Sequence, residues 1–148
     1  MWRLAQPADD DSLVEMCLRL FAEDPGPLRV PAGNMRATLA TLRGDPARGC
    51  AVVLDIEGEL CGYALLIAFW SNHLRGTVCE VDELFVVPEH RNQGHASSLF
   101  TALAQGDLLP TSMVAIALGV SPDNLRARRL YEPLGFAEAG ITMVRRLP

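Results

Sequence analysis

The residues best suited to chemistry lie in a short turn, Arg91-Asn92-Gln93-Gly94-His95-Ala96. The turn follows an apolar run at residues 84–87, which predicts a buried strand, and it leads into a helical pattern that begins at Gly94. Small residues at Gly94 and Ala96 allow a ligand to approach the backbone closely. The free N–H groups of a first helical turn attract anions, above all phosphate. The turn alone does not establish a phosphate site, because most turns of this kind bind nothing.

Carboxylates beside the same run and one tyrosine could transfer protons. Asp82 and Glu83 directly precede the run, and Glu80 is a third candidate for a general base. Because neighbouring strand residues point to opposite faces, only one of Asp82 and Glu83 can face a given ligand, and alternation does not choose between them. Solvated charges at the end of a strand explain these residues equally well. Tyr131 lies on the apolar face of another helical pattern, so periodicity alone favours a core tyrosine.

The elements that must position these residues alternate between strand and helix patterns. About seven strands are predicted, at residues 2–5, 50–56, 60–69, 77–87, 113–120, 136–138 and 141–147, and four helices at residues 12–23, 31–43, 94–106 and 124–134. Ser12 and Glu15 form a capping box for the first helix, and Gly135 stops the last. This order predicts an α/β (α+β layered) fold in a single domain, residues 1–148. Its central sheet is mixed and mostly antiparallel, with the helices on its faces.

Composition narrows the class of function. The 148 residues carry a net charge of −5, which argues against a nucleic-acid partner because such a partner requires a basic face. No apolar run approaches the ~20 residues that span a bilayer, so no membrane partner is expected. Polar residues follow the N-terminus at once, without a signal-peptide pattern, so we expect a cytoplasmic protein. Cysteines and histidines lack the spacing of a metal site, so no metal is expected.

Two motifs together resemble a known family. The segment VPEHRNQGHA at residues 87–96 is similar to the V-x-P-x-x-R-x-x-G-x-G/A signature of GNAT N-acetyltransferases. The segment NLRARRLYEPLGF at residues 124–136 is similar to that family's second signature, N-x-x-A-x-x-L-Y-x-x-x-G-F. Their order and separation fit the family over nearly the whole chain. The stretch VDELFV at residues 81–86 also resembles a short motif of polyamine and diamine acetyltransferases.

The resemblance implies acetyl-coenzyme A as co-substrate and gives roles to individual residues. By this resemblance, main-chain N–H groups of the turn hold the diphosphate of coenzyme A. The pantetheine arm pairs with the backbone of the apolar run like an additional strand, and Asn124 bonds the pantetheine amide region. The implied cofactor-binding residues are Leu84, Phe85, Val86, Arg91, Asn92, Gln93, Gly94, His95, Ala96, Ser97 and Asn124.

The candidate catalytic residues are Tyr131 and Asp82, to which the resemblance gives roles, and Glu83, which lies beside Asp82 before the apolar run. Tyr131 would point at the thioester sulfur and protonate the thiolate as it leaves. A carboxylate would accept the proton of the attacking amine, directly or through a water molecule. The similarity to polyamine enzymes aligns Asp82 with their base, whereas the alternation of the strand leaves both carboxylates open.

Two departures from the family pattern bear on these roles. Asn92 and Gln93 stand where the family often has glycine followed by lysine or arginine, so the site loses a cation and cofactor binding would rest more on backbone amides. Pro133 lies in the last turn of the predicted helix that carries Tyr131, where its ring crowds the carbonyl of Arg129 and disfavours helical geometry at Glu132. The motif therefore does not fix the direction of the Tyr131 side chain.

The sequence thus predicts an acetyl-coenzyme A-dependent N-acetyltransferase. A small primary amine is the expected acceptor because the candidate pocket residues are acidic, and Glu23 and Asp24 could bind its cation. Arg126 or Arg128 could reach the 3′-phosphate of the cofactor. The alternatives are acetylation of a protein N-terminus or lysine, and a non-catalytic acyl-coenzyme A sensor or scaffold. A homodimer is also expected, as is common in the family.

Overall fold

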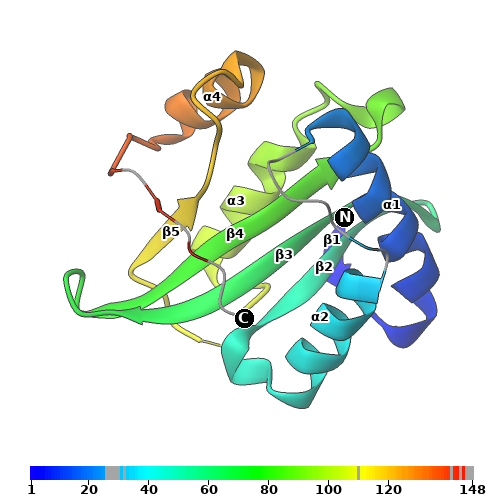
Figure 1. Cartoon of the computed structure of the whole chain (residues 1–148), viewed down its shortest axis with the longest axis horizontal. Helices are drawn as coiled ribbons and strands as arrows, with labels where there is room; N and C mark the ends of the chain where they lie inside the picture. Colours follow the sequence, from blue (N-terminus) through cyan, green and yellow to red (C-terminus); the bar gives the residue numbers. More distant parts are fainter. Residues whose placement is uncertain (26–30, 32, 110, 141, 144, 146–148) are drawn as a thin grey trace.

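The computed structural model describes residues 1–25, 31, 33–109, 111–140, 142–143 and 145. Its helices and strands are β1 (Trp2–Leu4), α1 (Asp10–Glu23), α2 (Gly33–Gly44), β2 (Gly49–Ile56), β3 (Glu59–Ser71), β4 (Gly76–Val86), α3 (His95–Gln105), β5 (Ala115–Leu118) and α4 (Leu125–Tyr131) (Figure 1). Short 3-10 turns at Pro7–Asp9, Pro46–Arg48, Pro88–His90 and Glu132–Leu134 join some of them. No helix in the described ranges has the length and apolar character needed to cross a bilayer.

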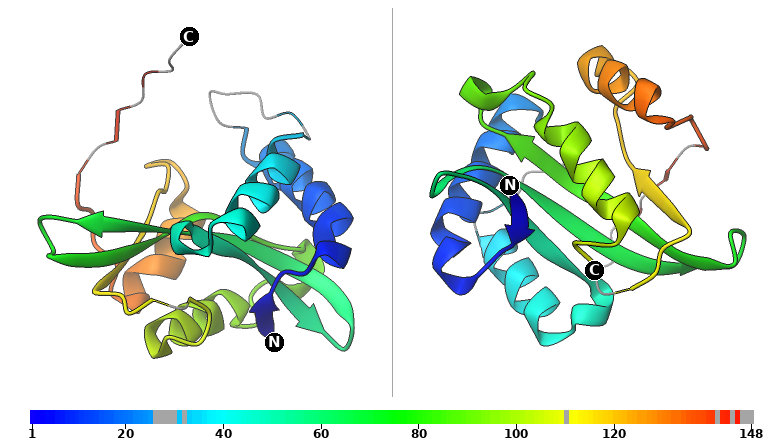
Figure 2. Two further views of the ribbon diagram at one scale, coloured as in Figure 1. Left: turned by 90° about the horizontal axis from the view of Figure 1, so that it is seen from below. Right: turned by 180° about the vertical axis from the view of Figure 1, so that it is seen from behind.

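The strands form one sheet in the order β1-β2-β3-β4-β5, in which the first four run antiparallel to their neighbours and β5 runs parallel to β4. Helices α1 and α2 cover one face, and α3 covers the other (Figure 2). The predicted α/β layered class, with a mostly antiparallel sheet and four helices, is confirmed. The described residues contain five strands instead of about seven.

The strand predicted at residues 136–138 is wrong, because these residues lie outside any sheet. The ring of Phe136 packs instead against Phe100 of α3 and Tyr131 of α4, with ring centroids 5.1 and 5.8 Å away. Its backbone N–H donates to the Tyr131 carbonyl at 3.3 Å, which closes the turn after α4. The side chain and the backbone N–H of Phe136 are therefore both engaged with α3 and α4, and this residue does not pair in a sheet. The partner strand predicted at residues 141–147 falls largely outside the described residues.

The start of α1 also differs from the prediction. Ser12 and Glu15 lie inside the helix, which begins at Asp10. The N-cap position of α1 is Asp9, whose carboxylate makes no capping bond to this helix but accepts the Gln6 N–H at 2.7 Å and pairs with Arg3 at 2.8 Å. The predicted capping box of Ser12 and Glu15 is therefore wrong, since both residues lie beyond the N-cap position.

The core has two parts, one on each face of the sheet. On the α1 and α2 face, buried side chains from both helices pack against Val53, Tyr63 and Phe85. On the α3 face, Leu99, Phe100 and Leu103 pack against the other side of the same strands. Strand β4 thus faces a helix layer on either side, which holds its backbone rigidly where the site lies.

Strand β5 stays beside β4 for only part of its length. The parallel pairing runs from Val78 opposite Ala115 to Val81 opposite Leu118 and then stops, although the sequence predicted a strand at residues 113–120. Beyond this point β5 leads away toward α4, while β4 continues to Val86 beside β3 (Figure 1). The sheet therefore opens along the second half of β4.

Candidate functional site

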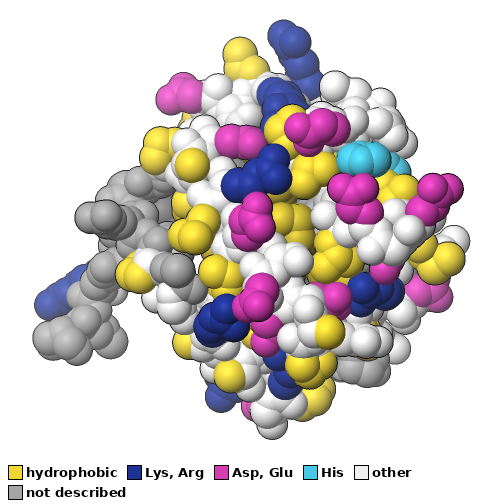
Figure 3. Space-filling view, turned by 90° about the vertical axis from the view of Figure 1, so that its right-hand side faces the viewer, with side chains coloured by type: hydrophobic (Ala, Val, Ile, Leu, Met, Phe, Trp, Pro, Cys, Tyr) yellow, Lys and Arg dark blue, Asp and Glu magenta, His cyan; other side chains and the backbone are white. Residues whose placement is uncertain are grey.

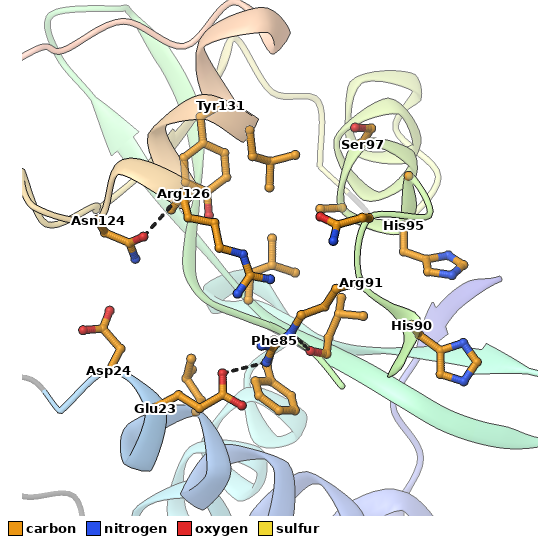
Figure 4. A pocket seen from close by; sticks show the side chains of 18 of the residues that line it. Glu23, Asp24, Phe85, His90, Arg91, His95, Ser97, Asn124, Arg126 and Tyr131 are labelled. Carbon is orange, nitrogen blue, oxygen red and sulfur yellow. Dashed lines mark hydrogen bonds and ion pairs between the residues drawn. The ribbon is translucent and has the colours of Figure 1, made fainter. Parts of the chain in front are cut away.

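A pocket of about 530 Å³ occupies this opening. Its walls come from four places: the end of α1, the second half of β4, the turn before α3 with its first helical turn, and α4 with the residues before it. The lining residues are Leu20, Glu23, Asp24, Leu84, Phe85, Val86, His90, Arg91, Asn92, Gly94, His95, Ala96, Ser97, Ser121, Asp123, Asn124, Arg126, Ala127, Leu130 and Tyr131. Two motifs that are far apart in the sequence thus face one cavity (Figure 4).

The turn before α3 has the backbone conformation of an anion cradle. Asn92 and Gly94 both have positive φ angles, 61° and 81°. The first bond of α3 runs from the Ser98 N–H to the Gly94 carbonyl at 2.9 Å, so the preceding N–H groups have no partner within the helix. Because Ala96 and Ser97 line the pocket, these groups stand at its wall, where the helix dipole adds positive potential.

The departure from the family pattern at Asn92 has a conformational explanation. With φ at 61° the residue is left-handed, a region that asparagine enters more readily than most other side chains. Asparagine thus replaces the frequent glycine while keeping the shape of the turn. The side-chain amide of Gln93 donates to the Glu89 carbonyl at 3.2 Å, and Gln93 does not line the pocket. Gln93 is therefore the one predicted cofactor-binding residue of the turn that lies outside the pocket wall.

Arg91 fastens the turn to the rest of the site. Its Nε donates to the Val86 carbonyl at 2.6 Å, and a terminal nitrogen pairs with Glu23 of α1 at 2.7 Å. The guanidinium also lies over the Phe85 ring, 5.3 Å from its centroid. Through these contacts Arg91 holds α1, β4 and the turn together.

The opened edge of β4 supplies the floor of the pocket. Leu84 and Val86 pack toward α3, while Phe85 packs toward α1. Beyond Val81, β5 no longer pairs with this edge. Backbone groups of a strand that lacks a neighbour on one side can pair with an extended ligand, as in β-strand addition. The three residues predicted to lie beside pantetheine are thus all in the pocket wall.

A β-bulge separates the two candidate bases. In the β3–β4 register, Leu65 faces Glu83 and Leu66 faces Val81, so Asp82 has no opposite residue. Simple alternation therefore fails here, which is why the sequence could not assign the two faces. Asp82 is exposed, and neither Asp82 nor Glu83 lines the pocket. Glu80, the third candidate, is paired within the sheet between β3 and β5.

Glu83 points into the α1 side of the sheet. Its carboxylate accepts a hydrogen bond from the Tyr63 hydroxyl at 2.7 Å. Burial, followed by the nearby charge of Asp82, outweighs the opposing effects of this bond and of Cys17, so the pKa of Glu83 is raised above its ordinary value. A carboxylate with a raised pKa is better matched to proton transfer near neutral pH. Glu83 lies two residues before Phe85, which does line the pocket.

Tyr131 reaches the pocket from α4. Its ring packs edge-on against Phe100, with centroids 5.9 Å apart, and its hydroxyl points into the cavity (Figure 4). Burial raises the pKa of Tyr131, which keeps the phenol protonated at neutral pH. Helix α4 ends at Tyr131, and a 3-10 turn containing Pro133 follows, with Glu132 still in helical geometry. The proline therefore tightens the chain after Tyr131 and does not displace it from the pocket.

Asn124 begins α4. Its side-chain oxygen accepts the Ala127 N–H at 3.1 Å, so the residue caps the helix and lines the pocket at the same time. Of the predicted site residues, the structure gathers all but Asp82, Glu83 and Gln93 in the pocket wall. Six lining residues were not predicted as site residues: Leu20, His90, Ser121, Asp123, Ala127 and Leu130. The only signal for Ser121 and Asp123 was their position just before the second motif.

Charges of both signs border the pocket. Glu23 and Asp24 lie at its α1 side, and Arg126 extends into it from α4 (Figure 4). The surrounding surface is likewise mixed, with acidic and basic side chains interspersed on the face in Figure 3. An anion held here would therefore depend on local donors, namely the N–H groups of the turn and individual arginines. Among the described residues, no group of histidine, cysteine or carboxylate side chains has the arrangement of a metal site.

Comparison with known proteins agrees with this geometry. The sequence pattern of the acetyltransferase (GNAT) family matches residues 14–136. An uncharacterized N-acetyltransferase from Archaeoglobus fulgidus is 37% identical over 81 residues, which is 54% of this chain and 54% of that protein. The match thus spans about half the length of this curated relative.

Two solved structures share the fold. A possible acetyltransferase from Clostridium difficile 630 superimposes with a TM-score of 0.80 at 20% identity, covering 100% of this chain and 97% of that one. An aminoglycoside N-acetyltransferase in complex with coenzyme A gives a TM-score of 0.74 at 17% identity, covering 100% and 99%. At these identities the likeness concerns the fold.

Proposed function

Because the chain belongs to the acetyltransferase (GNAT) family, as its two motifs predicted, we propose that it transfers the acetyl group of acetyl-coenzyme A to the primary amine of a small molecule. One observation carries this proposal. The anion cradle before α3 and the opened edge of β4 face the same pocket, so one wall can hold a diphosphate while another pairs with an extended arm.

The cofactor is proposed to lie across the pocket in one direction. Its diphosphate would accept N–H groups between Asn92 and Ser97, and its pantetheine arm would run along residues 84–86 toward the bulge. The Asn124 amide would contact the pantetheine, and the Tyr131 hydroxyl would lie near the sulfur. A similar fold occurs in the aminoglycoside enzyme that holds coenzyme A, which supports this arrangement.

The proposed reaction is direct attack of the amine on the thioester. A new bond forms between nitrogen and the acetyl carbon, the carbon–sulfur bond breaks, and the thiolate takes a proton from Tyr131. The second proton, which the nitrogen loses once it is acylated, returns to the Tyr131 phenolate. The amine must first lose its own proton, which costs roughly 4–5 kcal/mol at pH 7 for a pKa of about 10.4. We assign that proton to Glu83, reached through a water molecule because Glu83 stands behind the pocket wall. Asp82 is the competing base, on the exposed bulge.

The acceptor is proposed to be a small cationic amine. Glu23 and Asp24 border the pocket beside β4, and Asp123 borders it from the side of α4. Carboxylates in these places would attract an ammonium group before it is deprotonated. A cytoplasmic location and a homodimer, both expected from the sequence, belong to the same proposal.

Turnover with a panel of acceptors tests the proposal. Purified protein and acetyl-coenzyme A would be incubated with diamines, polyamines, amino acids and amine-terminated peptides, and release of free thiol would be measured. The expected result is thiol release with one or more small amines. Release with peptides alone would favour a protein acetyltransferase. Saturable binding of acetyl-coenzyme A without release for any acceptor would favour a sensor or scaffold.

A further inference from the structure

The cation that the first motif lacks can be sought among the side chains around the proposed diphosphate site. Arg91 is already engaged by the Val86 carbonyl, by Glu23 and by the Phe85 ring. Gln93 is neutral and its side chain bonds the Glu89 carbonyl outside the pocket. The turn itself therefore offers the diphosphate its backbone N–H groups and an arginine that is largely committed to protein contacts.

The histidines of this region do not take the place of that cation. The rings of His90 and His95 lie on the side of the turn away from Tyr131 and Arg126 (Figure 4). The Nε2 atom of His95 is buried without a hydrogen-bond partner among the described residues. A buried Nε2 atom on that side of the turn is not presented to an anion between the turn and Arg126.

Arg126 approaches the same place from the opposite wall. It lies two residues after the cap Asn124, and its guanidinium extends from α4 into the pocket in the direction of Arg91 (Figure 4). In the described part of the chain no ion pair involves Arg126. Arg128 lies two residues further along the helix. Its guanidinium nitrogens are 3.7 and 3.8 Å from carboxylate oxygens of Glu132 and Glu138. Of the two arginines that the sequence left open, the structure thus directs Arg126 into the cavity.

We infer that Arg126 binds the diphosphate of coenzyme A from α4 and replaces the cation absent at Gln93. The inference rests on the proposed function and specifies how its site works. A guanidinium is planar and presents parallel N–H donors, so it can bond two oxygens of one anion. With the backbone of the turn on one side and Arg126 on the other, the anion would be held between two elements that are separate in the sequence. Cofactor binding would then also draw α4 toward the turn.

The test compares three variants by isothermal titration calorimetry. Arg126→Gln removes the charge, Arg126→Lys keeps it without the planar fork, and Arg129→Gln removes an exposed charge on the same helix outside the pocket lining. Each would be titrated with coenzyme A and with 3′-dephospho-coenzyme A, which keeps the diphosphate. Circular dichroism would show that each variant is folded.

The expected loss for Arg126→Gln is about 10- to 100-fold in affinity, the usual range for a charge-assisted hydrogen bond. The loss should be of similar size for both ligands, smaller for Arg126→Lys and absent for Arg129→Gln. Unchanged affinity in Arg126→Gln would overturn the inference, while binding by the unaltered protein would leave the proposed function standing. A loss seen with coenzyme A but not with the dephospho ligand would also overturn it, because the 3′-phosphate would then be the partner. An unaltered protein that binds neither ligand would refute inference and function together.

Discussion

Tyr131 and Glu83 occupy surroundings that push both pKa values upward, with different consequences for proton transfer. Burial keeps the phenol in its neutral form, which is the form that can donate a proton. Burial raises the pKa of Glu83, so its carboxylate is a stronger base than that of an exposed glutamate and accepts a proton more readily. Such a division of roles by environment is typical of acid and base pairs in enzymes. Each assignment can be tested by a substitution that preserves shape.

Tyr131→Phe should lower kcat by about 10²- to 10⁴-fold, because the variant loses the proton donor for the thiolate. The ring and its packing against Phe100 and Phe136 are retained, so coenzyme A affinity should change little. Steady-state turnover and calorimetry on the same sample would separate the two effects. An unchanged kcat would assign Tyr131 to the core alone.

Glu83→Gln should lower kcat by about 10²- to 10⁴-fold, whereas Asp82→Asn should have little effect. Glutamine can still accept the Tyr63 hydrogen bond, so the packing behind the pocket is preserved. The assignment to Glu83 fails if Asp82→Asn loses as much activity. Thiol release measured for both variants at saturating cofactor would decide between them.

The same pair of variants tests the raised pKa through stability. Because the folded-state pKa of Glu83 lies above its ordinary value, the native state binds more protons than the unfolded state between these two pKa values. Stability from this group is present at low pH and is lost as pH rises through that window. Glu83→Gln should therefore melt at a higher temperature than the unaltered protein at pH 7, and the difference should shrink toward pH 4. Exposed Asp82→Asn serves as the control and should show no such trend.

At the scale of elements, the site depends on how α3 begins. The helix is flanked by two glycines in the left-handed region, Gly94 at φ 81° and Gly106 at φ 80°. Neither position has an atom within 4 Å of where a Cβ would stand, so a substitution at either meets backbone strain without a clash. Gly94 and Gly106 thus have similar backbone conformations, and a substitution at Gly106 can serve as a control for the same substitution at Gly94.

Gly94→Ala and Gly106→Ala should each destabilise the protein by about 1–2 kcal/mol, the usual cost of left-handed geometry for alanine. Only Gly94→Ala should also weaken coenzyme A binding, because relaxation of its φ would turn the N–H groups of the cradle. Denaturant unfolding and calorimetry of both variants would test this. Equal affinity in the two variants would mean that the cradle does not hold the cofactor.

Helix α4 contributes several side chains to the pocket because one side of this short helix faces the cavity. Its start is fixed by the Asn124 cap and its end by the 3-10 turn and Gly135, which has a φ of 89°. Between these limits the helix presents Arg126, Ala127, Leu130 and Tyr131 to the pocket, at spacings that place them on one side. The helix therefore carries both proposed contacts to the cofactor and the proposed acid.

At the scale of the molecule, the pocket joins elements from both halves of the chain, so a ligand should stabilise the whole fold. At a free concentration 100-fold above its Kd, a ligand that binds only the native state adds about 2.7 kcal/mol. For a domain of this size, that corresponds to a rise in Tm of about 5–10 °C. Coenzyme A should produce this shift in a thermal melt, and adenosine at the same concentration should not. Equal shifts with both would indicate that the cradle and the β4 edge contribute nothing.

The sequence by itself determined the local parts of this protein. The helix before Gly106, the strands at residues 50–56 and 60–69 and the stop at Gly135 were all predicted, because each depends on periodicity or on residues with special backbone freedom. The two motifs also predicted the family. Such features depend on residues that are close together in the chain, so they can be read from a single sequence.

Only the tertiary structure decided how these parts meet. The bulge at Asp82 arises from pairing with β3, so no pattern within β4 could show which carboxylate turns toward Tyr63. Phe136 lies outside the predicted strand because its ring packs against aromatic rings on α3 and α4. The pocket itself exists because β5 leaves β4 after Leu118, which is a property of the sheet and of no single segment. Contacts between residues far apart in the chain fix these choices, and their geometry follows from packing that the linear order does not state.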